Sequence, residues 1–237
     1  MSNSFSSNSV LNAYIRIEEM LSDVLRVVPY CDAHKSVWSD SLVPVLLESC
    51  SLLDSLWKYE AQQSPCVTKD RFTMCDYFTY FGNYMQPKWV VFWGETPEVL
   101  KPFENWSMSA SYTSNDYTEL DWWEAYNSVK HDRLMNRMRA TLAISVKALG
   151  AVFLGILRCE YCRDAIAQVG WLSGLHSNPA AFLGEDSGWT EDDWIAAESK
   201  LFSYAVGWTC RPIPHNWTWQ GPASHRFCDW FATYSRD

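Results

Sequence analysis

A short segment near the middle of the chain gathers side chains that suit phosphate chemistry. Asn127 and His131 are four residues apart, so they share a face if the segment is helical. Lys130, Arg133 and Arg137 follow at three- and four-residue steps and would form a cationic stripe beside them. An imidazole, an amide and several cations would then lie close together, and cations stabilise charge on a phosphate. The segment therefore predicts a local phosphate-binding site.

The charge of the whole chain restricts where such a site can lie. The 237 residues include 19 Lys and Arg against 28 Asp and Glu, a formal net charge of −9. This balance disfavours indiscriminate binding to nucleic acid or to anionic membranes. The stretch from Lys130 to Arg139 is a local basic island in an acidic chain. The alternative interpretation of that island is a solvated helix face without a ligand.

The order of residues in this segment resembles that of a known superfamily. The run Trp123-x-x-Tyr126-Asn127-x-x-Lys130-His131-x-Arg133 lies after two amphipathic segments and before a long Ala-rich one. It is similar to the motif of prokaryotic HEPN domains, in which an Arg and a polar residue precede a His by a few positions. Asn127 and His131 match the polar residue and the His, whereas Tyr126 stands where the family has its Arg. The resemblance covers roughly residues 11–164, apart from the segment just before Asp121.

The resemblance implies an up-and-down helical bundle that often dimerises. Many HEPN proteins are metal-independent endoribonucleases of phage defence, CRISPR and toxin systems, and others are noncatalytic. Applied to this chain, the resemblance implies the following roles: His131, Asn127 and Lys130 as catalytic residues, and Arg133, Arg137 and Tyr126 as substrate-binding residues. It also implies a homodimer without metal or cofactor, with RNA and a protein partner such as an antitoxin as binding partners. The alternative is a noncatalytic helical module that dimerises or docks a partner, which Tyr126 and the acidic total charge favour.

Hydrophobic periodicity predicts an all-α fold. Apolar residues recur at helical spacing in four segments, namely 11–28, about 39–62, 121 to about 168, and 190–206. Asp121 and Glu124 would cap the third helix reciprocally, and Thr190 would cap the fourth. Strong alternating strand patterns are missing. Val90–Trp93 is a candidate short strand, but nothing in the sequence supplies a clear partner.

We expect one domain over residues 10–237, after a flexible leader over residues 1–9. A helical core over residues 11–164 would carry an irregular aromatic insertion at 86–120, where prolines and turn residues are frequent. The Trp- and Pro-rich residues 170–237 would form a C-terminal extension that wraps the core, since large aromatic residues are burial anchors. Trp122 and Trp123 are expected in the core or at a bundle interface.

Eight cysteines are spread along the chain without the density of a disulfide scaffold. Cys159-x-x-Cys162 has the spacing of half a zinc site, and Cys210, His215, His225 and Cys228 are candidates for the rest. Because the first pair falls in an expected continuous helix, buried thiols are the preferred interpretation.

The start of the chain shows no signal-peptide pattern. The longest apolar run, Ala148–Leu157, is about half of a membrane span. We therefore expect a cytoplasmic protein without a membrane partner, and a buried core helix at this run.

Overall fold

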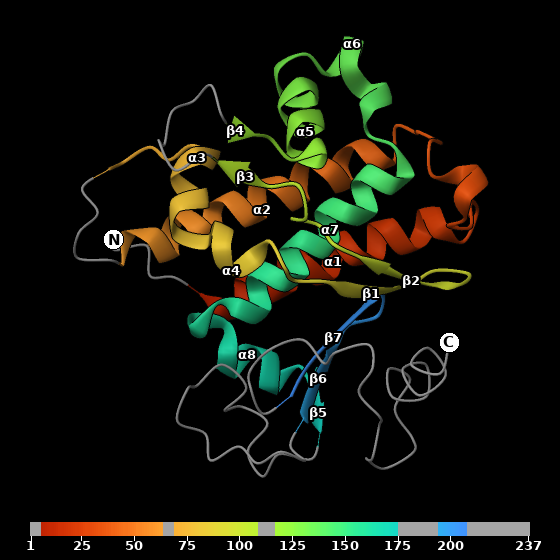
Figure 1. Cartoon of the computed structure of the whole chain (residues 1–237). Helices are drawn as coiled ribbons and strands as arrows, with labels where there is room; N and C mark the ends of the chain where they lie inside the picture. The colour runs from red at the N-terminus through yellow and green to blue at the C-terminus, as the bar shows by residue number, and fades with distance from the viewer. Residues whose placement is uncertain (1–5, 64–68, 109–116, 175–193, 208–237) are drawn as a thin grey trace.

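The computed structural model describes residues 6–63, 69–108, 117–174 and 194–207 (Figure 1). Within them, helices pack against a five-stranded antiparallel sheet, and a two-stranded sheet lies apart from it. The fold is therefore mixed, and the prediction of an all-α protein was wrong. The sheet draws on the two parts of the chain that the sequence presented as an irregular insertion and a wrapping extension.

Three long helices form the centre of the molecule. They are α1 (Ser7–Leu25), α2 (Leu42–Gln62) and α7 (Leu142–Arg158). Every residue from Ala148 to Leu157 is buried, which confirms the expected core helix. A Cβ added to Gly155 would lie 2.6 Å from Cδ1 of Leu53, so the glycine permits the close approach of α2 to α7. None of the described helices is by itself long and apolar enough to cross a membrane.

The chain starts its first helix earlier than expected. Ser6 caps α1 by accepting a hydrogen bond from the backbone N–H of Ser9 at 3.3 Å. The last residues of the expected leader are therefore helical. The start of α2 at Leu42, next to the expected 39–41 boundary, agrees with the pattern.

An aromatic layer follows α2. It contains α3 (Met74–Tyr77), a π-helical turn (Phe78–Gly82) and α4 (Asn83–Met85). Trp57 of α2 stacks on Trp106, with ring centroids 5.4 Å apart and planes 6° from parallel. These contacts explain the aromatic richness of this region as core packing.

The main sheet joins distant segments of the chain. Its order is β2 (Pro97–Leu100), β1 (Val90–Trp93), β7 (Phe202–Gly207), β6 (Trp194–Glu198) and β5 (Leu172–Gly174). The prediction of a strand at β1 is confirmed.

The strand β1 has two partners that the sequence did not indicate. In β2, Pro97 pairs with Trp93, and in β7, Phe202 pairs with Phe92. The small sheet pairs β3 (Ser107–Met108) with β4 (Tyr117–Thr118). The expected irregular insertion at 86–120 thus contains β1, β2, β3 and β4.

The helix predicted from Thr190 to Val206 is wrong. Residues 194–207 form the antiparallel pair β6 and β7, while Thr190 lies outside the described residues. Ala196 and Ala197 on β6 are both buried, so successive side chains are apolar on both faces. Periodicity cannot distinguish such a strand from a buried helix.

A buried carboxylate ties this strand pair to the helices. Glu18 of α1 is 4% exposed and accepts hydrogen bonds from Tyr14 Oη at 3.1 Å and Ser199 Oγ at 2.5 Å. It also accepts from the backbone N–H groups of Lys200 at 3.3 Å and Leu201 at 2.9 Å. One side chain thereby fixes the β6–β7 turn against α1.

The helix expected to run from Asp121 to about 168 is also broken. It divides into α5 (Asp121–His131), α6 (Arg133–Asn136), the 3₁₀ turn η4 (Arg137–Arg139), α7 and, after Cys159, α8 (Arg163–Gln168). The expected reciprocal cap does not form, because Leu120 is the N-cap residue of α5 and has no side-chain cap. The longest described helix is α2, with 21 residues, whereas α5 has 11.

Candidate functional site

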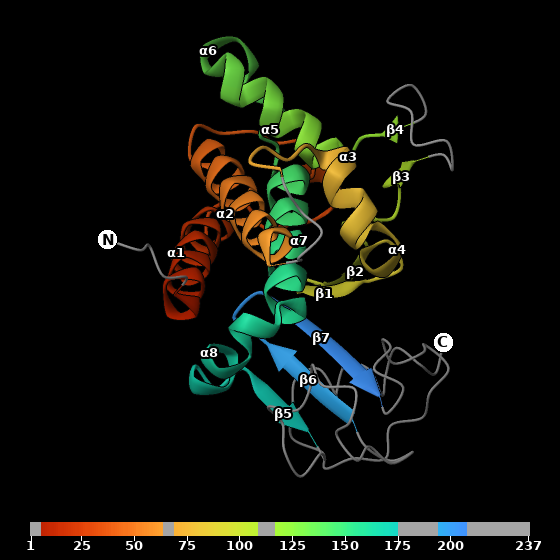
Figure 2. The ribbon, with the colours of Figure 1, turned by 90° about the vertical axis from the view of Figure 1, so that its left-hand side faces the viewer.

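The residues singled out by sequence lie on a helical arm, residues 121–139, made of α5, α6 and η4. Figures 1 and 2 show α5 leading away from α2 and α7, with α6 at the far end of the molecule. α5 is anchored by an apolar face that includes Trp122 and Val129, both fully buried. The outer end therefore projects from a rigid base.

Asp132 separates α5 from α6. Its backbone leaves helical geometry, with φ −146° and ψ 84°. Its carboxylate then caps α6 by accepting from the N–H of Met135 at 3.2 Å. The chain turns at this point, so the cations do not form one continuous helical stripe.

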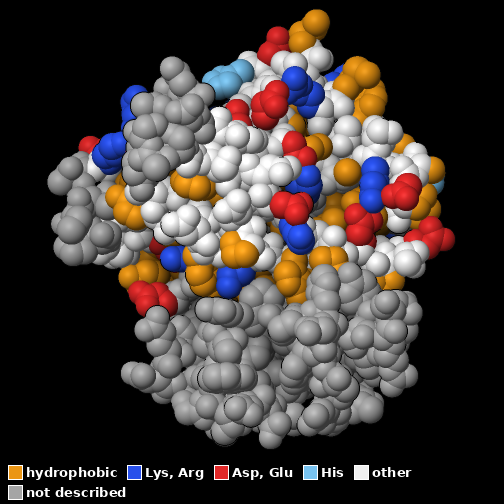
Figure 3. Space-filling model, viewed as in Figure 1, with side chains coloured by type: hydrophobic (Ala, Val, Ile, Leu, Met, Phe, Trp, Pro, Cys, Tyr) orange, Lys and Arg blue, Asp and Glu red, His pale blue; other side chains and the backbone are white. Residues whose placement is uncertain are grey.

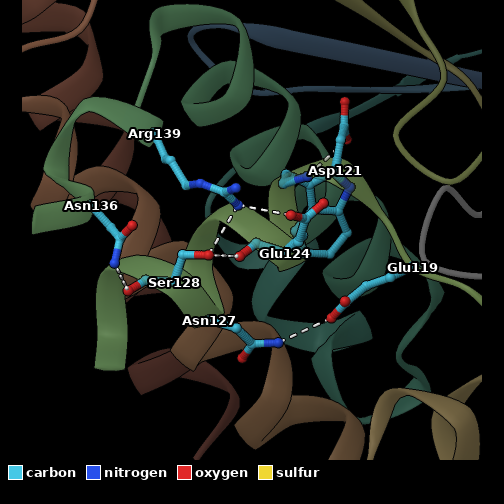
Figure 4. A network of polar contacts seen from close by, with 8 residues as sticks. Glu119, Asp121, Glu124, Asn127, Ser128, Asn136 and Arg139 are labelled. Atoms are coloured by element: carbon cyan, nitrogen blue, oxygen red, sulfur yellow. Dashed lines mark hydrogen bonds and ion pairs between the residues drawn. The ribbon is translucent and has the colours of Figure 1, made fainter. Parts of the chain in front are cut away.

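Asn127 and His131 share α5 at four-residue spacing, as expected. His131 is exposed, but Asn127 is half-buried and donates from Nδ2 to Oε1 of Glu119 at 3.0 Å (Figure 4). Burial raises the pKa of Glu119, nearby Glu124 adds to the rise, and the Asn127 hydrogen bond opposes it. The amide next to His131 is thus engaged by a carboxyl group.

Tyr126 and Lys130 form a second contact on α5. Tyr126 is 5% exposed, and its ring lies 4.9 Å from that of Trp123. The Lys130 ammonium lies 5.1 Å from the Tyr126 ring centroid, a cation–π distance. Tyr126 is therefore a core residue, with no open ring face for stacking on a nucleobase.

The arginines of the arm have different surroundings. Arg137 lies over the ring of Trp38 at 5.3 Å and contacts Oδ2 of Asp40 at 3.4 Å. Arg139 donates to Oε1 of Glu124 at 2.8 Å and to Oγ of Ser128 at 3.0 Å, which ties η4 back to α5 (Figure 4). Arg133 is exposed and has no side-chain partner among the described residues. The structure brings His131 and Arg133 to the outer end and turns Arg137 toward the body.

Sequence reasoning missed the apolar end of the arm. Leu134, Met135 and Met138 are 82%, 78% and 59% exposed and form what we call the tip. Figure 3 shows hydrophobic side chains at the top of the molecule, over α6, beside charged ones. The available signal was the sequence Leu-Met-x-x-Met that begins two residues after Asp132, a residue that favours N-caps and helix breaks.

The candidate zinc ligands are not assembled within the described residues. There, no three His, Cys, Asp or Glu side chains lie close enough to hold a metal. Cys159 and Cys162 are buried free thiols. The hydrogen bond between them and their burial raise the pKa of Cys159. Cys210, His215, His225 and Cys228 lie outside the described residues.

Comparison of the chain with models of protein families, with curated proteins and with solved structures finds no match.

Proposed function

We propose that this protein is a noncatalytic docking module that binds an acidic protein surface through the tip of the arm. The observation that carries the proposal is the exposure of Leu134, Met135 and Met138 at the end of the projecting arm. Apolar side chains gathered at the surface and edged by polar ones mark interaction sites. Methionine adapts to irregular surfaces and is enriched at interfaces, as is arginine.

The charge next to the tip defines the class of partner. Arg133 and His131 are exposed beside it, and Lys130 adds a third exposed basic group near the end of α5. A partner with an apolar depression and an acidic rim would satisfy both the apolar and the basic groups.

The base of the arm is suited to rigid docking. Lys147 binds Asp121, Arg139 binds Glu124, and Arg137 binds Asp40. Each exposed pair is individually weak, but together with the buried face of α5 they hold the arm in one orientation. A preorganised arm loses little conformational freedom on binding.

A photo-crosslinking residue in place of Met135 tests this proposal in cells that express the full chain. We expect an adduct with an acidic protein, and we expect Arg133→Glu in the same chain to abolish it. The matched control places the crosslinker at Val169, an exposed apolar residue at the C-cap of α8. Absence of an adduct at Met135, or one that Arg133→Glu leaves unchanged, refutes the docking function.

The second candidate is a metal-independent endoribonuclease of the HEPN kind. The exposure of His131 and the unpaired state of Arg133 within the described residues favour it, because both are accessible to a phosphate. The engaged amide of Asn127, the adjacent Glu119 and the buried Tyr126 weigh against it.

The test is incubation of purified protein with total RNA and a chelator. A ribonuclease should cleave under chelation and lose cleavage on His131→Ala. Cleavage that chelator abolishes, or that His131→Ala leaves intact, excludes this mechanism.

The compartment we propose is the cytoplasm. The described cysteines, including the half-buried Cys31 and Cys75, are free thiols, which suits a reducing environment.

A further inference from the structure

A long groove lies between α1 and α2 on the surface. It consists of two adjoining hollows of about 620 and 500 Å³, which share Met20, Asp23 and Pro44 in their linings. Ile17 and Leu52 line the first hollow, and Val24 and Val28 line the second. The groove therefore combines apolar side chains with polar and charged ones in its first hollow and is mainly apolar in its second. Val27, at its end in the second hollow, is 81% exposed.

The groove is acidic at its edge. Glu19, Asp23 and Glu48 line the first hollow, against a single cation, Arg16. Asp23 also pairs with Arg26 at 2.6 Å, whereas Glu19 and Glu48 have no ion-pair partner among the described residues. Two exposed carboxylates are thus available beside an apolar surface.

The groove and the tip are complementary in their apolar side chains and in their charge. The tip offers leucine and methionine next to Arg133 and His131, and the groove offers apolar side chains next to Glu19 and Glu48. Two copies of a chain with net charge −9 repel each other as wholes. A contact that joins a basic part of one copy to an acidic part of the other opposes this repulsion.

We propose that the partner of the tip is a second copy of this chain, whose α1–α2 groove receives Leu134, Met135 and Met138. This inference rests on the docking function and names its partner. The contact forms between molecules because α6 points away from the body, and the Arg137 contact with Asp40 holds the base of the arm in that orientation (Figure 2). Two different surfaces meet, so each copy contributes one tip and one groove.

The proposal is tested by complementation between two variants. The tip variant carries Leu134→Glu and Met135→Glu, and the groove variant carries Glu19→Lys and Glu48→Lys. All four positions are exposed, so folding is retained. Val169→Glu is the matched control for an exposed apolar position outside both surfaces.

Sedimentation from about 1 µM to about 1 mM covers weak to moderate association. We expect the wild type and Val169→Glu to self-associate, less so at high salt. Each double variant alone should associate at least about tenfold more weakly, as loss of central contacts requires. An equimolar mixture should form a 1:1 dimer, because the groove of the first variant accepts the tip of the second.

Other outcomes separate this inference from the docking function. A monomeric wild type throughout this range, or a mixture that stays monomeric, overturns the self-docking proposal. If the crosslinker at Met135 then still yields an adduct with another protein, the docking function survives with a different partner. If it yields none, both proposals are overturned.

Discussion

Replacing Glu18 by Ala should destabilise the fold strongly, because this carboxylate is the polar link between α1 and the β6–β7 turn. It accepts four hydrogen bonds, from two hydroxyl groups and two backbone N–H groups, although it is only 4% exposed. Alanine provides no acceptor and leaves a small void. The turn would lose its attachment to the helices.

The size of the stability loss depends on which of the four donors can find another acceptor once the carboxylate is removed. Ser199 Oγ also lies 3.1 Å from Tyr14 Oη, so these two hydroxyl groups can pair with each other. The N–H of Lys200 is partly exposed and can bind water, but that of Leu201 is buried. An unsatisfied buried donor costs about 1–3 kcal/mol, and a hydrogen bond to a charged group contributes about 1.5–3 kcal/mol. With the void, we expect a loss of about 3–5 kcal/mol in the free energy of unfolding.

Urea unfolding followed by tryptophan fluorescence measures this loss. Glu18→Gln keeps one acceptor oxygen and should lose about half as much. Glu19→Ala, one residue further along on the exposed side of α1, should change stability by less than about 0.5 kcal/mol. A Glu18→Ala protein within about 1 kcal/mol of wild type would show that the turn does not depend on this carboxylate.

Three further predictions concern buried residues. Gly155→Val should lower the free energy of unfolding by about 1–3 kcal/mol, because the side chain would overlap a leucine of α2; unchanged urea denaturation would refute the tight approach. Burial raises the pKa of Glu60, and Arg158 opposes the rise. The wild type keeps its full stability at a pH below the pKa of Glu60 in the unfolded chain and loses stability as pH rises through the raised pKa of the folded state. Glu60→Gln has no group that titrates at this position, so its stability should rise relative to wild type as pH increases from about 4. A constant difference would contradict this. Cys159 should resist alkylation by iodoacetamide until the protein unfolds, and fast labelling of the native protein would contradict its buried, raised-pKa state.

The helices α1 and α2 were predictable because each has one apolar face and a turn signal at its end. Residues 11–28 and about 39–62 carry that repeat over several turns, and α1 and α2 lie there. Val90–Trp93 was predictable as a strand because it is short, apolar and β-branched or aromatic. Its partners were not predictable, because β7 lies more than a hundred residues further along and pairing between distant segments leaves no local signal.

The β6–β7 pair shows where local patterns fail. Residues 195–197 and 202–205 of the two strands are all buried, so exposed and buried side chains do not alternate along them. The turn between them is held by Glu18 from α1 together with hydrogen bonds between Ser199 and Phe202. From sequence, Glu18 is one more charged residue on an amphipathic helix. Its burial and its hydrogen bonds to the distant β6–β7 turn distinguish it from exposed Glu19.

The sequence singled out the cations of the arm, but their arrangement depends on Asp132. In one continuous helix, Lys130, Arg133 and Arg137 would lie along a single face and their charges would add at one phosphate. Asp132 ends α5 and caps α6, so the three cations separate: Lys130 lies over Tyr126, Arg137 turns to Asp40, and Arg133 is free within the described residues. The same turn exposes the apolar side chains that follow it. Because the remaining cation lies beside exposed leucine and methionine, the arm matches an apolar surface with an acidic edge better than it matches a phosphate.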